Sequence, residues 1–175
     1  VLFRSVPTGI SKEDLQRLTL QIMHFRPEQV MIVGDMFHSY ANKELEQWLR
    51  WRNDFSAIEF MLIKGNHDIL SLDWYAAANI RVYKEQHTIA PFTFIHDAAT
   101  LETNAVEENT IISGHLHPGI AMKGRGKQHL RFPCFYHAAP QFYLPAFSYF
   151  SGMAMIQPKK NQAVFAIVND QIMPL

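Results

Sequence analysis

The fold is decided by a short stretch in which an apolar run meets a polar turn, Phe60-Met61-Leu62-Ile63-Lys64-Gly65-Asn66-His67-Asp68. Four consecutive apolar residues predict a buried strand. Glycine lets the chain turn sharply at the strand end, so that the side chains that follow point into a site. The same pattern occurs in Val30-Met31-Ile32-Val33-Gly34-Asp35, where a second predicted strand delivers Asp35.

A third motif, Gly114-His115-Leu116-His117, follows the apolar run at 110–113. We expect His115 and His117 to lie on a strand, which would place both imidazoles on one face in a geometry suited to a metal. Gly-Asp and Gly-Asn-His-Asp alone are common in turns, but all three motifs in this order indicate a function. Carboxylate, amide-oxygen and imidazole ligands together favour manganese, iron or zinc over a calcium or thiolate site.

Helices are predicted between the strands. Ser11, with an acidic residue three positions later, is typical of a helix start, and Pro27 ends this helix. A second helix is predicted over 42–52. The inward apolar residues of the two helices are Leu15, Leu18, Ile22 and Phe25, and Leu45, Trp48 and Leu49. Apolar strands separated by helices favour an α/β fold with a parallel sheet covered on both faces.

The second half of the chain is richer in strands. Apolar runs at 80–83, 88–89, 92–96, 110–113, 130–136 and 163–168 predict short strands, and 124–127 is typical of a hairpin tip. The whole pattern favours an α/β/β/α sandwich. Neither a repeat nor an interdomain linker is evident, so we expect a single domain over 1–175.

The amino-acid composition limits the classes of protein to which the chain can belong. The chain has 175 residues, 48% of them hydrophobic, which supports a packed globule. No apolar run approaches the roughly 18 residues needed to span a membrane. The one cysteine, Cys134, excludes an internal disulfide, fits a reducing cytoplasm and is expected to be buried.

Charge gives little support for broad electrostatic attraction to nucleic acid, because 16 Lys and Arg balance 16 Asp and Glu. A local basic group follows the third motif and is either a solvated loop or a contact for a phosphate backbone. Its members are Lys123, Arg125, Lys127, His129 and Arg131.

The three motifs in this order resemble the calcineurin-like metallophosphoesterase superfamily, whose members hydrolyse phosphate esters with two bridged metal ions. Four further pieces resemble one branch, the bacterial ligase-associated DNA-damage-response endonucleases. These pieces are Gly34-Asp35-Met36-Phe37-His38-Ser39, Ile95-His96-Asp97, Leu130-Arg131-Phe132-Pro133-Cys134-Phe135 and Leu144-Pro145-Ala146-Phe147.

The resemblance implies a four-layer α/β/β/α metallophosphoesterase sandwich and a metal-dependent phosphodiesterase. It further implies a cytoplasmic DNA endonuclease linked to DNA repair. Its substrate would be nucleic acid, its partners a DNA ligase or helicase system, and it would have no membrane association.

The resemblance also implies a role for each motif residue. Asp35 would bridge two divalent metal ions, manganese above iron or zinc. Asn66, His96 and His115 would bind the second ion, and His117 the first. His67 would bind no metal and would donate a proton or hydrogen bond to the leaving oxygen.

Two more residues would support the site. Asp68 would fix the backbone or orient the neighbouring histidine. His38 would contact the substrate or support a ligand. The alternatives are a buried structural role for His96 and a surface role, capping the following helix, for His38.

One departure from the superfamily pattern stands out. That pattern begins with Asp-x-His on the first strand, and this chain has no aspartate followed two residues later by histidine. We expect that this first strand is missing and that residues 1–5, which match the translation of a common sequencing adapter, are a non-native leader. The alternative is that they are native. Without the Asp-x-His motif, only Asp35 and His117 remain for the first metal, and we expect the chain as written to be nearly inactive.

Two other functions stay open. One is a phosphoesterase for a small nucleotide or a lipid-linked phosphate, which the neutral charge favours. The other is a non-catalytic phosphate-binding remnant or scaffold that has lost its first metal site.

Overall fold

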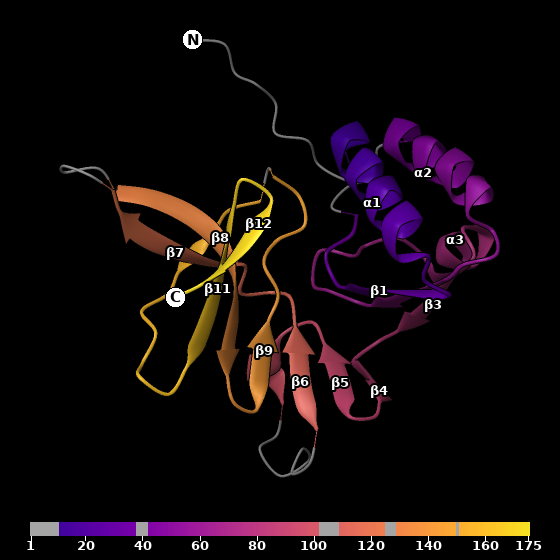
Figure 1. Cartoon of the computed structure of the whole chain (residues 1–175). Helices are drawn as coiled ribbons and strands as arrows, with labels where there is room; N and C mark the ends of the chain where they lie inside the picture. Colours follow the sequence, from indigo (N-terminus) through magenta and orange to yellow (C-terminus); the bar gives the residue numbers. More distant parts are fainter. Residues whose placement is uncertain (1–10, 38–41, 102–108, 125–128, 150) are drawn as a thin grey trace. The chain divides into compact units, whose positions relative to one another are not determined.

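The computed structural model of the chain describes residues 11–37, 42–101, 109–124, 129–149 and 151–175 (Figure 1). The expected leader at 1–5 and His38 lie outside the described residues. The chain divides into two compact units. Unit 1 comprises Val1–Glu85 with Ser148–Phe150, and unit 2 comprises Gln86–Phe147 with Ser151–Leu175. The described residues form a mixed α/β structure, which confirms the predicted fold class at that level. The expectation of a single domain stays a prediction.

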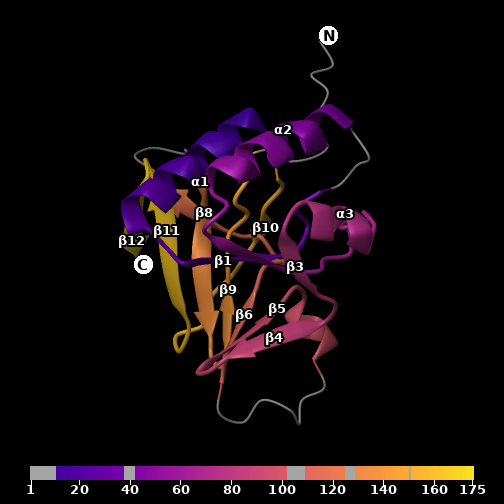
Figure 2. The same ribbon diagram turned by 90° about the vertical axis from the view of Figure 1, so that its right-hand side faces the viewer.

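Unit 1 contains a parallel sheet of β1 (Gln29–Val33), β2 (Glu59–Ile63) and β3 (Ile80–Tyr83), in that order. The predicted parallel pairing is therefore confirmed, whereas the predicted cover on both faces stays a prediction. Its helices are α1 (Lys12–Phe25), α2 (Asn42–Asp54) and α3 (Leu72–Ala77). In Figures 1 and 2, α1 and α2 lie on the same side of this sheet. None of the described helices is long and apolar enough to cross a membrane.

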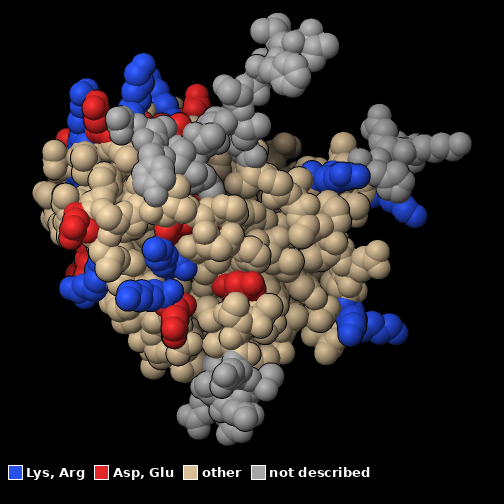
Figure 3. All heavy atoms as spheres, turned by 180° about the vertical axis from the view of Figure 1, so that it is seen from behind, with Lys and Arg blue, Asp and Glu red and all other residues tan. Residues whose placement is uncertain are grey.

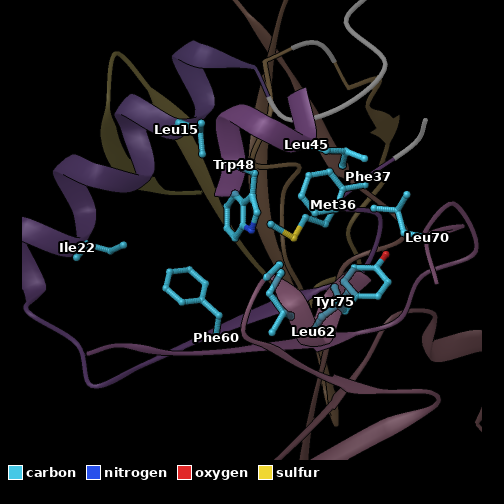
Figure 4. Close-up of a cluster of buried hydrophobic side chains, with 12 residues drawn as sticks. Leu15, Ile22, Met36, Phe37, Leu45, Trp48, Phe60, Leu62, Leu70 and Tyr75 are labelled. Carbon is cyan, nitrogen blue, oxygen red and sulfur yellow. The ribbon is translucent and has the colours of Figure 1, made fainter. Parts of the chain in front are cut away.

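The core of unit 1 lies between the helices and one sheet face. Trp48 of α2 is fully buried at its centre, with its ring 5.8 Å from that of Phe37 and 5.7 Å from that of Phe60 (Figure 4). Edge-to-face aromatic contacts of this kind add to the stabilisation from apolar burial. The predicted inward residues of both helices belong to this cluster, apart from Phe25: Leu15, Leu18, Ile22, Leu45, Trp48 and Leu49.

The start of α1 is confirmed as predicted. The Ser11 hydroxyl accepts a bond from the Asp14 N–H (3.1 Å), and the Asp14 carboxylate accepts one from the Ser11 N–H (3.2 Å). The inward position of Phe25 is wrong, because its side chain is 70% exposed. Phe25 is the last helical residue, and the helix ends directly after it at Arg26, which is left-handed (φ 48°).

The burial of the two predicted strands differs. β2 is buried along nearly its whole length, as its continuous apolar run predicts. β1 is only half buried, so the prediction of a buried strand is too strong. Among the described residues β1 pairs with β2 alone, which leaves it at the edge of this sheet.

Unit 2 is dominated by a nine-stranded mixed sheet. Seven strands follow the order β10-β7-β8-β9-β6-β5-β4, and β11 pairs with both β8 and β12. Their bounds are β4 (Gln86–Ile89), β5 (Phe92–Ile95), β6 (Thr110–Ser113), β7 (Pro118–Lys123), β8 (His129–Ala138), β9 (Gln141–Tyr143), β10 (Ala154–Met155), β11 (Ala163–Val168) and β12 (Gln171–Pro174). A short 3-10 helix, η1 (Ala98–Thr100), follows β5.

β11 and β12 form a hairpin whose turn residues, Asn169 and Asp170, both have positive φ (49° and 60°). Two successive positive-φ residues are typical of the type I′ hairpin turn.

Cys134 on β8 is fully buried, as predicted, and burial raises the pKa of its thiol to about 11.

Candidate functional site

The carboxyl ends of β1 and β2 lie at the same edge of the parallel sheet in unit 1. Directly after β1, Gly34 (φ 81°) and Asp35 (φ 55°) both adopt left-handed conformations. Aspartate tolerates this region better than most side chains. Gly65 packs against Asp35, because a Cβ at position 65 would lie 2.3 Å from Asp35 Oδ1 and 2.5 Å from Asp35 N. The close approach of the two turns therefore requires glycine here.

Asp68 is buried, with 2% of its surface exposed, and joins both turns. Its Oδ2 accepts hydrogen bonds from the backbone N–H of Asp35 (2.8 Å) and of Gly65 (2.9 Å). Its Oδ1 accepts from the N–H of Met36 (2.9 Å) and of Phe37 (3.1 Å). Bonds to an ionised carboxylate are stronger than bonds between neutral groups. Asp68 therefore holds the turn after β1 against the turn after β2.

The residues between Gly65 and Asp68 face solvent. The side chains of Asn66 and His67 are both exposed. The His67 backbone N–H donates to Asp35 Oδ1 at 2.9 Å, which fixes the Asp35 carboxylate against this segment. Unit 1 thus brings four predicted site residues to one sheet edge: Asp35, Asn66, His67 and Asp68.

Tyr75, on α3, was not predicted as part of this region. It is fully buried, and burial followed by the nearby Asp68 charge raises the pKa of its phenol above the usual range. The available signal was the start of α3, where the Ser71 hydroxyl accepts the Trp74 N–H at 3.2 Å. Serine ahead of a short run with an acidic residue is a typical helix start.

In unit 2, His96 and His115 follow the ends of two adjacent parallel strands, β5 and β6. The His96 carbonyl accepts hydrogen bonds from the N–H of Gly114 (3.1 Å) and of His115 (3.0 Å). His96 Nε2 lies 3.0 Å from His115 Nδ1, with the two rings edge to face. The His96 side chain is only 6% exposed, whereas that of His115 is exposed.

This histidine pair has the chemistry of a metal-ligand pair. Two imidazole nitrogens at this separation are either joined by one N–H···N hydrogen bond or bound to the same cation. Two nitrogen ligands at about 2.0–2.1 Å from one ion lie roughly 3 Å apart, close to the observed separation of 3.0 Å. The separation of the two nitrogens is therefore compatible with a shared transition-metal ion.

The prediction that His115 and His117 lie on one strand is wrong. β6 ends at Ser113 and β7 begins at Pro118. Between them is a turn in which the His117 N–H donates to the Gly114 carbonyl (3.2 Å). Both partners of β6 end opposite Ser113, so the chain beyond it has no ladder to extend. His117 is left-handed (φ 48°), and its carbonyl accepts the N–H of a β10 residue, Ala154 (3.0 Å).

The remaining candidates are only partly described. His38 lies outside the described residues, as do Arg125 and Lys127 of the basic group. Lys123 on β7 and Arg131 on β8 are exposed. These two strands pair antiparallel on either side of the expected hairpin tip.

A comparison with protein-family models finds no match, and neither does a search of curated proteins. Among solved structures, the chain is similar to the nuclease MPE of Pseudomonas putida, with a TM-score of 0.82 and 28% sequence identity. The similarity covers 98% of this chain and 82% of that chain. The chain therefore has a nuclease-like fold.

Proposed function

We propose that this chain is a metal-dependent phosphodiesterase that cleaves nucleic acid. The observation that carries the proposal is its fold similarity, over nearly its whole length, to a bacterial nuclease. The resemblance of its motifs to the metallophosphoesterase superfamily supports the same activity and, with it, a four-layer α/β/β/α sandwich. We extend the proposal to a DNA endonuclease linked to DNA repair that works with a DNA ligase or helicase system.

Asp35, Asn66, His96 and His115 would hold one divalent ion, and Asp35 and His117 would contribute to a second. The donor types suit manganese, with iron or zinc as alternatives. The spacing of the two imidazole nitrogens supports this assignment for His96 and His115. When bound, such a cation pair supplies charge stabilisation to a phosphate and lowers the pKa of water.

The chain's own residues have distinct tasks in this proposal. Asp35 supplies the negative charge that lets two cations bind close together, and its carboxylate is oriented by the His67 N–H. The exposed His67 imidazole donates a proton from a ring nitrogen to the oxygen of the leaving group. His38 would contact the substrate or support a ligand, and Asp68 would fix the backbone or orient the neighbouring histidine.

The test is cleavage of single-stranded DNA, plasmid DNA and bis-p-nitrophenyl phosphate with manganese and with EDTA, in wild type, Asp35→Ala and Asp73→Ala. Asp73 is an exposed aspartate of the same unit and serves as the control. We expect manganese-dependent cleavage that is slow, because only Asp35 and His117 would hold one of the two ions, and that is abolished by Asp35→Ala and retained by Asp73→Ala. Manganese binding without cleavage of any substrate would contradict the activity and favour a non-catalytic phosphate-binding protein.

A second candidate is a phosphoesterase for a small nucleotide or a lipid-linked phosphate. The balance of 16 basic and 16 acidic residues favours it. On the face drawn in Figure 3, basic and acidic side chains are scattered, and no extended basic surface is visible there. Cleavage of bis-p-nitrophenyl phosphate without cleavage of either DNA would decide for this candidate.

A further inference from the structure

We infer that Asp68 is a positioning residue that sets the metal-binding geometry of Asp35 before any metal arrives. The inference rests on the proposed function, because it takes Asp35 as a metal ligand. It assigns Asp68 neither to the metal nor to the substrate. Four hydrogen bonds within unit 1 carry the inference.

The carboxylate of Asp68 has no acceptor capacity left for a cation. An ionised carboxylate offers about four lone-pair sites. Four backbone N–H groups occupy them at distances between 2.8 and 3.1 Å, two on each oxygen. Asp68 is also nearly inaccessible, at 2% exposure. A saturated, buried carboxylate acts on the site through the backbone that it holds.

The backbone it holds is the one that carries the proposed bridging ligand. Three of the four N–H donors belong to consecutive residues, Asp35, Met36 and Phe37. Asp35 is left-handed (φ 55°), a conformation that a non-glycine residue keeps only when its surroundings enforce it. The Asp68 carboxylate provides that enforcement at the Asp35 N–H, while the His67 N–H fixes the Asp35 side chain.

A merely structural carboxylate is available in the same unit for comparison. Asp14 is equally buried, at 2% exposure, and accepts bonds from the N–H (3.2 Å) and hydroxyl (2.9 Å) of Ser11. Its partner lies three residues away and caps α1, whereas the Asp68 bonds to the β1 turn span 31 to 33 residues. Asp14→Asn is therefore the matched control for Asp68→Asn.

The first experiment measures Mn²⁺ binding by titration calorimetry, together with thermal stability, in the full chain. In Asp68→Asn one oxygen becomes an NH2 group, which cannot accept the two N–H bonds it faces. We expect manganese affinity to fall by about 10–100-fold, the usual cost of removing a residue that supports a ligand. Asp14→Asn should lose thermal stability but keep manganese affinity within about 2-fold. Wild-type affinity in a folded Asp68→Asn protein would overturn the inference.

The second experiment needs no variant and no metal. Hydrogen exchange of the metal-free wild-type protein reports on the amides of Asp35, Met36, Phe37 and Gly65. We expect all four to be protected, because Asp68 holds them without help from a cation. If they exchange freely until Mn²⁺ is added, the metal organises the turns and the inference is wrong. If they are protected but Mn²⁺ never binds, the proposed function fails, while the role of Asp68 in holding the two turns is confirmed.

Discussion

Asp35 is constrained from three directions at the level of single residues. Its φ of 55° is left-handed, its carboxylate accepts the His67 N–H, and Gly65 lies against its backbone. A side chain at position 65 would enter the space that the Asp35 carboxylate occupies. The position of the proposed bridging ligand therefore depends on a residue that has no side chain.

Gly65→Ala should destabilise the protein, since the new Cβ would meet Asp35 Oδ1 at 2.3 Å and the turn must shift. Forced rearrangements of a packed region cost about 1–3 kcal/mol. Urea denaturation of the metal-free protein measures the loss. Gly152→Ala is the control, because a Cβ there meets no atom within 4 Å and its effect should stay within about 0.5 kcal/mol. Equal stabilities for the two variants would contradict the close approach.

His67→Ala should keep metal binding and lose most turnover, because it removes the proposed proton donor and no ligand. The loss expected for a general acid is on the order of 10²–10⁴-fold in kcat. Steady-state hydrolysis of bis-p-nitrophenyl phosphate at saturating Mn²⁺, beside calorimetric Mn²⁺ titration, separates the two effects. His24→Ala, at an exposed position on α1, serves as the control. Wild-type turnover in His67→Ala would remove this residue from the mechanism.

At the scale of elements, the length of a segment and the reach of its contacts decided what could be predicted. α1 and β2 were predicted because their capping and apolar patterns are local. α3, β7, β9, β10 and β12 were missed: each has only two to six residues, and none was recognised from an apolar run like those that marked the equally short β3 and β6. The His-x-His turn was mistaken for a strand because the end of β6 is set by where its neighbours end.

The site shows the same division. Glycine-punctuated motifs pointed to Asp35, Asn66, His115 and His117, because strand ends that turn at glycine can be recognised from neighbouring residues in the sequence. His96 has no such glycine and was proposed from the family resemblance of Ile95-His96-Asp97. The four hydrogen bonds from backbone N–H groups to the Asp68 carboxylate could not be predicted from the sequence. Three of their donors are 31 to 33 residues away, and backbone groups carry no residue-specific mark.

The hairpin of β11 and β12 offers a prediction at this scale. Asp170 sits at φ 60°, a region that glycine occupies without strain and that aspartate occupies at some cost. Asp170→Gly should therefore stabilise the protein by about 0.5–1 kcal/mol, since Asn-Gly is the preferred type I′ pair. Urea denaturation measures the change. Asp73→Gly, inside α3, should instead destabilise the protein, and a loss of stability in both variants would contradict the turn assignment.

For the whole molecule, metal binding should appear as thermal stability. A ligand that binds only the folded state stabilises it by about 2.7 kcal/mol at 100 times its Kd. Mn²⁺ should therefore raise the melting temperature, EDTA should reverse the rise, and Asp35→Ala should abolish it. Ca²⁺ at the same concentration should do much less, because it prefers all-oxygen shells. Scanning fluorimetry measures all four conditions, and equal shifts with Ca²⁺ would contradict the imidazole ligand set.

The four hydrogen bonds that Asp68 accepts from the two turns also have a consequence for the order of events in folding. These bonds join the turn after β1 to the turn after β2, and the whole of α2 lies between the two turns in the sequence. They form only when the ends of this long segment have come together. We expect contacts of such sequence separation to form late in folding, because the entropic cost of closing the loop precedes the contacts that offset it. The position of Asp35 is thus expected to be set after the folding nucleus has formed, and to play no part in that nucleus. Energy gained from a bound ion then acts on the rate at which the native chain opens, and leaves the rate at which it folds almost unchanged.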